Sequence, residues 1–193
     1  MGKHHIETTQ GRIKRYNQPL PLIDYLMPFV VTGSKEVIKI ADIGSGYITT
    51  IGTYIPGQDS KFYHSDKQDF VEFFKLRNIT PINSVEIQNM EHMTYEDNFF
   101  DIVHCLNALD HTKHAYKAVE EMIRICKPGG WIYIDCHLDQ LDTGHLHYWN
   151  AKQDGTFTNG GETFDLKSFG FQIKFIDNGG ETRYNQIIAT LQK

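Results

Sequence analysis

The sequence predicts an α/β fold with a single Rossmann-like, doubly wound sheet. Short β-branched runs alternate along the chain with segments of helical periodicity, which is typical of strand–helix–strand units. The first of these runs opens into a glycine turn, and a later helical segment ends in Lys-Pro-Gly-Gly immediately before a strand. A length of 193 residues suits one domain with room for an elaboration, so we expect residues 1–193 to share one core.

Apolar residues at helical spacing over residues 20–31 predict a helix that covers the sheet, so residues 1–32 form an N-terminal segment and cap helix. Glycine and proline punctuation separates the elements that follow. We expect strands at residues 37–41, 61–64, 83–87, 99–106 and 131–136, and helices at residues 69–76 and 114–126. Residues 171–177 and 182–191 predict a closing antiparallel hairpin around Asn178-Gly179-Gly180.

Residues 138–168 interrupt this alternation with a long stretch rich in aromatic residues and glycine. Connections of this length are uncommon in compact domains and usually carry function. The stretch follows the carboxyl end of a predicted strand, which is where open α/β sheets bind their ligands. We therefore interpret residues 138–168 as an insertion on the ligand side of the sheet.

Composition excludes several classes of protein. The chain has 19 basic and 24 acidic residues, and a net charge of -5 argues against nucleic acid as a partner. No apolar run approaches the roughly 20 residues that span a bilayer, and the N-terminus lacks the apolar core of a signal peptide. Three scattered cysteines do not form a disulfide framework. We expect a cytoplasmic protein with no membrane contact.

The end of the first predicted strand carries a D-x-G-x-G turn at Asp42, Gly44 and Gly46. Glycines at this position let a ligand approach the backbone closely. Thr49 stands where a dinucleotide fingerprint has its third glycine, which disfavours pyrophosphate. Asp66, placed about 20 residues beyond the turn, suits an acid that accepts hydrogen bonds from ribose hydroxyls. Capping of the next helix is the alternative role of Asp66.

Four ordered segments carry a family resemblance: ADIGSG at 41–46, HSD at 64–66, the segment at 85–111 that contains FFDIVHCLNALDH, and EEMIRICKPGGWIYID at 120–135. Over about residues 20–192 the chain resembles the class I S-adenosylmethionine-dependent methyltransferases, in particular the small bacterial type 11 group. The resemblance implies seven strands in the order 3-2-1-4-5-7-6 with the last strand antiparallel and helices on both faces. It also implies S-adenosyl-L-methionine as the cofactor.

The same resemblance implies roles for individual residues. The methionine part of the cofactor would be cradled by the turn that contains Asp42, Gly44, Ser45 and Gly46, and the ribose would be held by Asp66. Asn89 and Met90 fall beside the adenine, and Asn107 would line the wall near the reactive methyl group. Two positions depart from the family pattern, because Asn89 replaces a usual acid and Ile48 replaces a usual third glycine.

An oxygen acceptor loses a proton during methyl transfer, and a histidine is suited to assist that loss near neutral pH. The resemblance places His111 and His147 beside the reaction, with Asp110 able to orient a neighbour or to cap the next helix. His145, Tyr148 and Trp149 are candidate acceptor-binding residues, although packing of the loop explains the aromatic pair equally well. His145 and His147 also have the spacing of two metal ligands, but no third ligand is evident nearby, so we predict no metal.

These observations favour a methyltransferase that acts on oxygen or nitrogen of a small polar acceptor, such as a sugar or another metabolite. Residues 138–168 would then form the acceptor side. An enzyme that uses S-adenosylmethionine without methylating an acceptor is one alternative, because fold alone does not fix chemistry. A non-catalytic binding protein is another, prompted by Ile48 and Asn89. The sequence indicates no oligomeric state.

Overall fold

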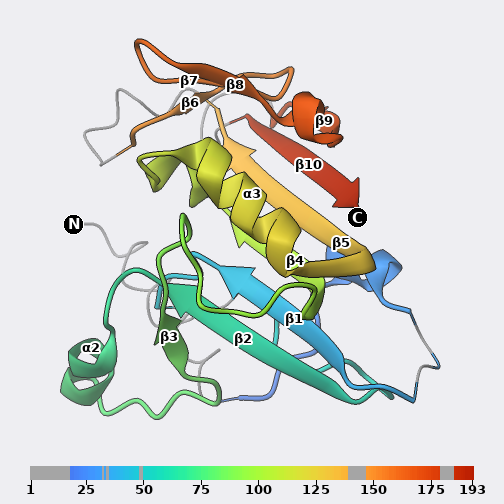
Figure 1. Ribbon diagram of the computed structural model, residues 1–193. Coiled ribbons are helices and arrows are strands. Elements are labelled where there is room, and N and C mark those ends of the chain that lie inside the picture. The colour runs from blue at the N-terminus through green and yellow to red at the C-terminus, as the bar shows by residue number, and fades with distance from the viewer. Residues whose placement is uncertain (1–17, 32, 34, 48–49, 139–146, 179–184) are drawn as a thin grey trace.

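In the computed structural model the chain forms a seven-stranded main sheet and a smaller three-stranded sheet (Figure 1). The structure describes residues 18–193 except 32, 34, 48–49, 139–146 and 179–184. The strands of the main sheet are β1 (Ile38–Ile43), β2 (Ser60–Asp66), β3 (Val85–Ile87), β4 (Phe100–Leu106), β5 (Cys126–His137), β9 (Gln172–Ile176) and β10 (Gln186–Gln192).

The order of the main sheet is β3-β2-β1-β4-β5-β10-β9, which confirms the predicted order. The first five strands pair in parallel, and β10 runs antiparallel to both β5 and β9. The buried β-branched runs account for this arrangement, since strands covered on both faces read as continuous apolar segments. β5 begins earlier than predicted, because Lys-Pro-Gly-Gly already belongs to the strand, with a register shift opposite β4.

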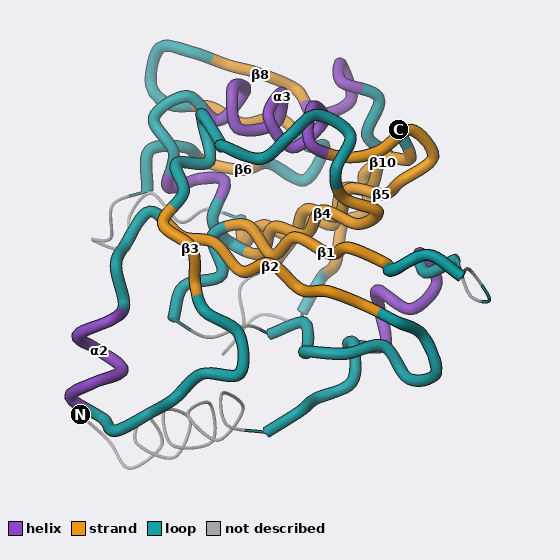
Figure 2. The backbone as a smooth tube through the Cα atoms, turned by 60° about the horizontal axis from the view of Figure 1, so that its bottom comes forward, coloured by secondary structure: helices purple, strands orange, loops and turns teal. Residues whose placement is uncertain are grey.

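Each face of the main sheet buries its own apolar cluster. On one face lies α3 (Ala115–Ile125), whose Ala118, Val119 and Met122 are fully buried against the sheet. The other face is covered by the 3₁₀ helix η1 (Asp24–Phe29), whose Leu26 is fully buried. Figure 2 shows α3 and the small sheet on the same side of the main sheet.

The N-terminal cap is shorter than the predicted helix over residues 20–31. It is one six-residue 3₁₀ segment with Pro28 inside it, and proline has no N–H with which to extend an α-helix. The helix predicted at residues 69–76 is α2 (Val71–Leu76). After the glycine turn, the described residues 50–59 form bridges and turns and contain no helix.

The insertion forms the small sheet, made of β6 (Asn150–Ala151), β7 (Thr156–Thr158) and β8 (Thr163–Asp165), followed by η4 (Leu166–Phe169). Its aromatic residues join the cluster that α3 covers, and Trp149, Phe157 and Phe164 stack or meet edge to face. Hydrophobic burial therefore fixes the insertion to the domain.

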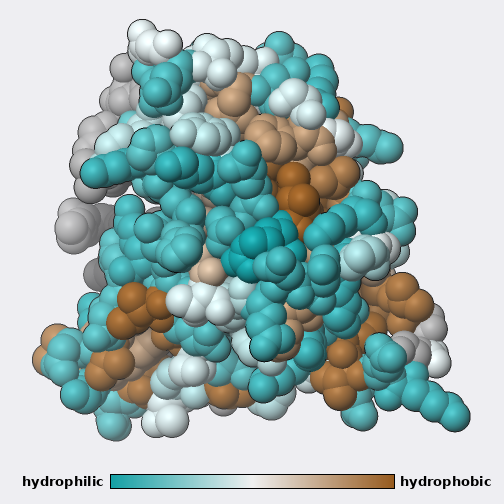
Figure 3. Space-filling model, viewed as in Figure 1, coloured by the Kyte–Doolittle hydropathy of each residue, from teal (hydrophilic) through white to brown (hydrophobic). Residues whose placement is uncertain are grey.

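Hydrophobic residues gather on the surface over α2 and β3, at the lower left of the face drawn in Figure 3. Val71, Leu76 and Ile87 are more than half exposed there. Among the described residues, no helix combines the length and the apolar character needed to cross a bilayer.

Candidate active site

Gly44 brings the turn after β1 against the loop after β4. Its φ of +69° lies in the left-handed region that favours glycine. A Cβ at this position would lie 2.4 Å from Ala108 Cβ and 3.0 Å from Met90 Cε. Packing therefore requires glycine at position 44, because Ala108 and Met90 already occupy the space that a Cβ would need.

Gly46 presents an open side. Its φ is +64°, and a Cβ added there would meet no atom of the residues that the structure describes within 4 Å. The Gly46 N–H donates to Asp66 Oδ2 at 3.0 Å, and the Ser45 N–H donates to the Ser65 carbonyl at 3.0 Å. The turn is therefore clamped to the carboxyl end of β2, with Gly46 as the point where a ligand has room.

Asp66 is half-buried at the same edge of the sheet. Its second oxygen, Oδ1, accepts a hydrogen bond from the Gln68 N–H at 2.9 Å. Both oxygens thus fix the carboxylate in one orientation beside the turn. A carboxylate accepts several hydrogen bonds at once, so two sugar hydroxyls can be added to this arrangement.

Asp42 lies inside a polar cluster between β1 and its neighbours. The carboxylate accepts from His104 Nδ1 at 2.8 Å and from His64 Nδ1 at 3.4 Å, and the Tyr25 hydroxyl lies 3.0 Å from His104 Nε2. Burial by itself raises the pKa of Asp42, but the hydrogen bonds from the two histidines hold that pKa well below its ordinary value. Both oxygens contact histidines of neighbouring strands, so Asp42 braces the sheet under the turn.

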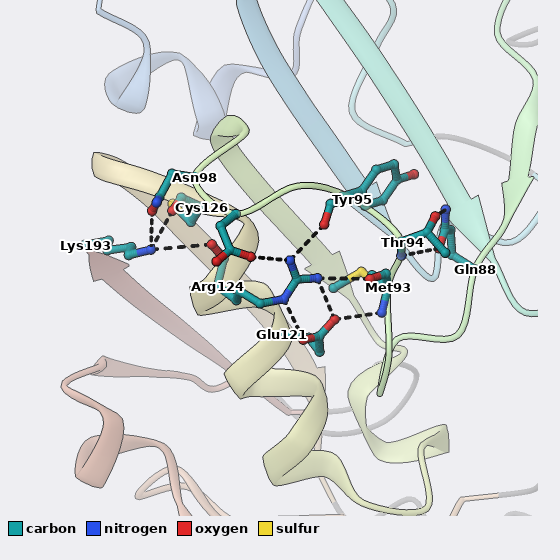
Figure 4. A network of polar contacts seen from close by, with 10 residues as sticks. Gln88, Met93, Thr94, Tyr95, Asn98, Glu121, Arg124, Cys126 and Lys193 are labelled. Carbon is teal, nitrogen blue, oxygen red and sulfur yellow. Dashed lines mark hydrogen bonds and ion pairs between the residues drawn. The ribbon is translucent and has the colours of Figure 1, made fainter.

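The segment that carries Asn89 and Met90 is held by α3. Arg124 donates to the carbonyls of Met93 and Tyr95 at 3.0 and 2.8 Å, and its Nε donates to Glu121 Oε1 at 2.7 Å (Figure 4). Glu121 Oε2 in turn accepts from the Met93 N–H at 2.7 Å. A bidentate, charge-assisted pair of this kind fixes orientation as well as distance.

Within that segment, the predicted adenine-side residues have distinct environments. The Asn89 side chain accepts from the Glu91 N–H at 3.0 Å and is exposed. Met90 is 9% exposed and lies against Gly44. Met90 therefore contributes an apolar wall next to the turn, and Asn89 keeps its amide near the surface.

Asn107 ends β4 in a left-handed backbone conformation with φ +47°. Non-glycine residues adopt this conformation at a cost and concentrate at functional sites. The Asn107 N–H donates to the Asp135 carbonyl at 2.7 Å, and its Oδ1 accepts from the His137 N–H at 3.3 Å. The ends of β4 and β5 are joined through this residue.

Asp135 is a buried acid on the opposite face from α3. One oxygen accepts from Gln186 Nε2 at 3.2 Å, and the other has no hydrogen-bond partner among the described residues. Burial raises the pKa of Asp135 to about 6, and the nearby His104 opposes the shift. No sequence pattern points to this residue, because its environment is created by the pairing of β5 with β10.

A second polar cluster lies where the loop after β4 meets the segment after β5. Asp110, in the 3₁₀ turn η2 (Leu109–His111), is 1% exposed and is hydrogen-bonded through Oδ2 to His147 Nδ1. The rings of His111 and His147 lie 4.2 Å apart between centroids. Two imidazoles and a carboxylate thus meet on the acceptor side of the predicted site.

Hydrogen bonds to main-chain carbonyls fix the segment that carries His147 against the turn that carries Asp110. The N–H groups of Tyr148 and Trp149 donate to the Asp110 carbonyl at 2.8 and 3.2 Å. The Trp149 indole N–H donates to the Lys113 carbonyl at 3.2 Å. Residues 37 positions apart in the chain are therefore fixed opposite each other.

The predicted acceptor-binding residues fall in three different situations. Tyr148 is 40% exposed and available to a ligand. Trp149 is 1% exposed and packs in the core, so the sequence-based expectation that its ring faces an acceptor is corrected: the indole anchors the insertion. His145, like Ile48, lies outside the described residues.

The glycine turn and Asp66 fit the S-adenosylmethionine that the sequence predicts. The open side of Gly46 accommodates close approach, the fixed carboxylate of Asp66 suits ribose hydroxyls, and Met90 offers an apolar surface. Sequence reasoning missed His64 and His104, since histidines inside strands carry no spacing signal of their own.

Comparisons with known proteins point to a methyltransferase domain. Residues 42–134 match the family model described as "Methyltransferase domain". Over 110 residues the chain is 29% identical to the ubiquinone/menaquinone biosynthesis C-methyltransferase UbiE of Cronobacter sakazakii, an alignment that covers 53% of this chain and 44% of the relative. The chain thus spans less than half the length of the curated relative that it matches.

Solved structures share the fold. A SAM-dependent methyltransferase from Aquifex aeolicus aligns with a TM-score of 0.50 at 19% identity and covers 93% of this chain and 97% of its own. A chain from the complex between the Haloferax volcanii Trm112 methyltransferase activator and a methyltransferase aligns with a TM-score of 0.56 at 12% identity, covering 95% and 90%. At these identities the likeness is one of fold.

Proposed function

Since the chain carries a domain of the class I S-adenosylmethionine-dependent methyltransferase family, we propose that it transfers a methyl group from S-adenosylmethionine to oxygen or nitrogen of a small polar acceptor. The observation that carries the proposal is the pairing of two sites at one edge of the sheet. One is the turn of Gly46 with Asp66, and the other is the cluster of Asp110, His111 and His147.

On the cofactor side, Asp66 would accept hydrogen bonds from the ribose, and the turn at Ser45 and Gly46 would receive the methionine part on the side where Gly46 has no Cβ. Met90 would contact the adenine. Asn107, joined to the end of β5, would line the wall between the cofactor and the acceptor. When bound, S-adenosylmethionine supplies a methyl carbon that bonds to the acceptor atom as its carbon–sulfur bond breaks, the electron pair going to sulfur.

On the acceptor side, His111 and His147 would face the reacting atom and assist the loss of its proton. The Asp110–His147 hydrogen bond fixes the imidazole, as an orienting carboxylate does in other histidine-assisted reactions. Tyr148 would provide an exposed aromatic surface for the rest of the acceptor. Orientation of the acceptor is the main contribution that the protein makes to such a displacement.

Product analysis tests the proposal. The protein is incubated with S-adenosylmethionine and pools of small polar metabolites, and the nucleoside products are separated by mass. S-Adenosylhomocysteine with a methylated acceptor supports it. Methylthioadenosine or adenosine indicates an enzyme that consumes the cofactor by another reaction, and unchanged S-adenosylmethionine with no binding favours a non-catalytic protein.

Carbon methylation is a second candidate. It is favoured by the similarity to UbiE, a protein named as a C-methyltransferase. A carbon acceptor with an acidic proton also needs assistance in losing that proton, so the histidine cluster suits it too. Carbon-13 NMR of the product made with labelled methyl groups separates carbon-bound from oxygen- or nitrogen-bound methyl groups by chemical shift.

A further inference from the structure

The cluster on the acceptor side has the composition of a metal site as well as of a proton relay. His111 and His147 offer imidazole nitrogens and Asp110 a carboxylate, and their ligand atoms lie within 4.8 Å of one another. Two histidines and one carboxylate form a common ligand set for divalent transition metals that keep positions open for a substrate. His145, the partner that sequence spacing suggested for His147, is not needed for this set.

A second observation points to a ligand at this place. Asp110 is 1% exposed, and its Oδ1 is a buried oxygen with no hydrogen-bond partner among the described residues. A buried carboxylate oxygen without a partner is costly, so such atoms call for a cation, a water or a catalytic role. Oδ2 of the same carboxylate already holds His147.

The hydrogen bond from His147 to Asp110 suits metal binding. It places His147 Nδ1 directly beside Asp110 Oδ2, so an ion that takes the place of the shared proton would be held by both residues. Ligand atoms that share one Zn²⁺ at about 2.0–2.1 Å lie about 3.4 Å apart. Closing the cluster from 4.8 Å thus takes a small movement of side chains.

We propose that Asp110, His111 and His147 bind one divalent transition-metal ion, and that the methyl acceptor is a small molecule whose oxygen atoms complete the coordination of that ion. The inference rests on the proposed methyl transfer and deepens it. The positive ion favours the deprotonated acceptor oxygen, whose proton leaves to water, and that oxygen then bonds to the methyl carbon as the carbon–sulfur bond breaks. The histidines would assist proton loss as ligands and not by taking the proton themselves.

Acceptors with two neighbouring oxygens fit this arrangement best. Three protein ligands leave an ion with open positions, and a pair of hydroxyls or a hydroxyl beside a carboxylate can fill two of them. An acceptor with a single amine or hydroxyl fills only one open position and would therefore bind the ion more weakly. The inference therefore narrows the acceptor class to chelating oxygen compounds.

Metal titration of the full chain tests the inference without reference to activity. The protein is treated with a chelator, dialysed and titrated with Co²⁺, whose visible absorption bands report coordination, and with Zn²⁺ by calorimetry. We expect one ion per chain. Asp110→Asn and His111→Gln should each weaken binding at least tenfold. His114→Ala is the matched control, since it removes a histidine that pairs with a carboxylate, Glu91, at 2.9 Å, and it should leave the affinity unchanged.

Circular dichroism verifies that each variant is folded, and His111→Gln, at a half-buried position, serves if Asp110→Asn does not fold. Equal Co²⁺ affinity in wild type and His111→Gln would overturn the inference. Chelator-resistant methyl transfer with no bound ion would overturn it as well while leaving the proposed function standing. Site-specific metal binding without any S-adenosylhomocysteine would uphold the metal site and refute the methyl transfer.

Discussion

Replacement of Asp66 by alanine tests the cofactor site most sharply. The change removes the acceptor of the Gly46 and Gln68 N–H groups, at 3.0 and 2.9 Å, together with the charge that would meet the ribose hydroxyls. Hydrogen bonds to a charged group contribute about 1.5–3 kcal/mol. Since about 1.4 kcal/mol is a factor of ten, the dissociation constant of S-adenosylhomocysteine should rise about 10- to 150-fold.

Asp69 provides the matched control for this variant. Its Oδ1 accepts from the Val71 N–H at 2.8 Å, a local arrangement like that of Asp66 with Gln68, but Asp69 is exposed and does not contact the glycine turn. Asp69→Ala should cost about 1 kcal/mol of stability, the usual net effect of one lost hydrogen bond, and keep the affinity of wild type. Calorimetric titration of both folded variants gives the comparison. Equal affinity in Asp66→Ala and wild type would refute the ribose assignment.

Three further predictions follow from single residues. Gly44→Ala should destabilise the fold far more than Gly46→Ala, because alanine at position 46 adds only the cost of a left-handed backbone, about 1–2 kcal/mol. Equal melting temperatures of the two variants would contradict this difference in stability. Gly46→Ala should nevertheless bind the cofactor more weakly than wild type. Burial raises the pKa of Asp135 from 3.8 to about 6, so the stability that its protonated form contributes is complete below about pH 4 and is lost as the pH rises through 6. Asp135→Asn should therefore be more stable than wild type by about 2–3 kcal/mol at pH 8 and equal to it at pH 4, and denaturant titrations that show a pH-independent difference would count against the burial argument. Arg124→Lys should cost about 1–2 kcal/mol of folding stability and weaken cofactor binding, because a lysine ammonium cannot donate to the Met93 and Tyr95 carbonyls at the same time, as a planar guanidinium does. Cofactor affinity equal to wild type would show that the segment that carries Asn89 and Met90 is not part of the cofactor site.

The parallel sheet could be predicted from the sequence because its strands are short, apolar and β-branched, and because turns mark where they end. Each of β1, β2 and β4 lies close to its predicted position. The cap helix was overestimated, since periodicity alone does not register that Pro28 limits an α-helix. The three strands of the insertion were not predicted, because two or three residues are too few to establish a period.

The candidate site divides in the same way. Asp66 could be placed from its distance along the chain, because the turn and the second strand of such a fold have fixed geometry. The contact of Asp110 with His147 could not, since the two residues meet only through the path of the insertion. Trp149 shows the ambiguity of aromatic residues, which serve packing and stacking with equal ease until burial is known.

The position of bound S-adenosylhomocysteine in a crystal structure tests the central claim most directly. We predict that its ribose hydroxyls lie within hydrogen-bond distance of the Asp66 carboxylate, with its amino-acid end at Gly46 and its adenine beside Met90. Binding at the opposite edge of the sheet would contradict the claim. A cavity of about 250 Å³ lies at that edge, between Val37 and Trp131, and a nucleoside found there would move the site away from the glycine turn.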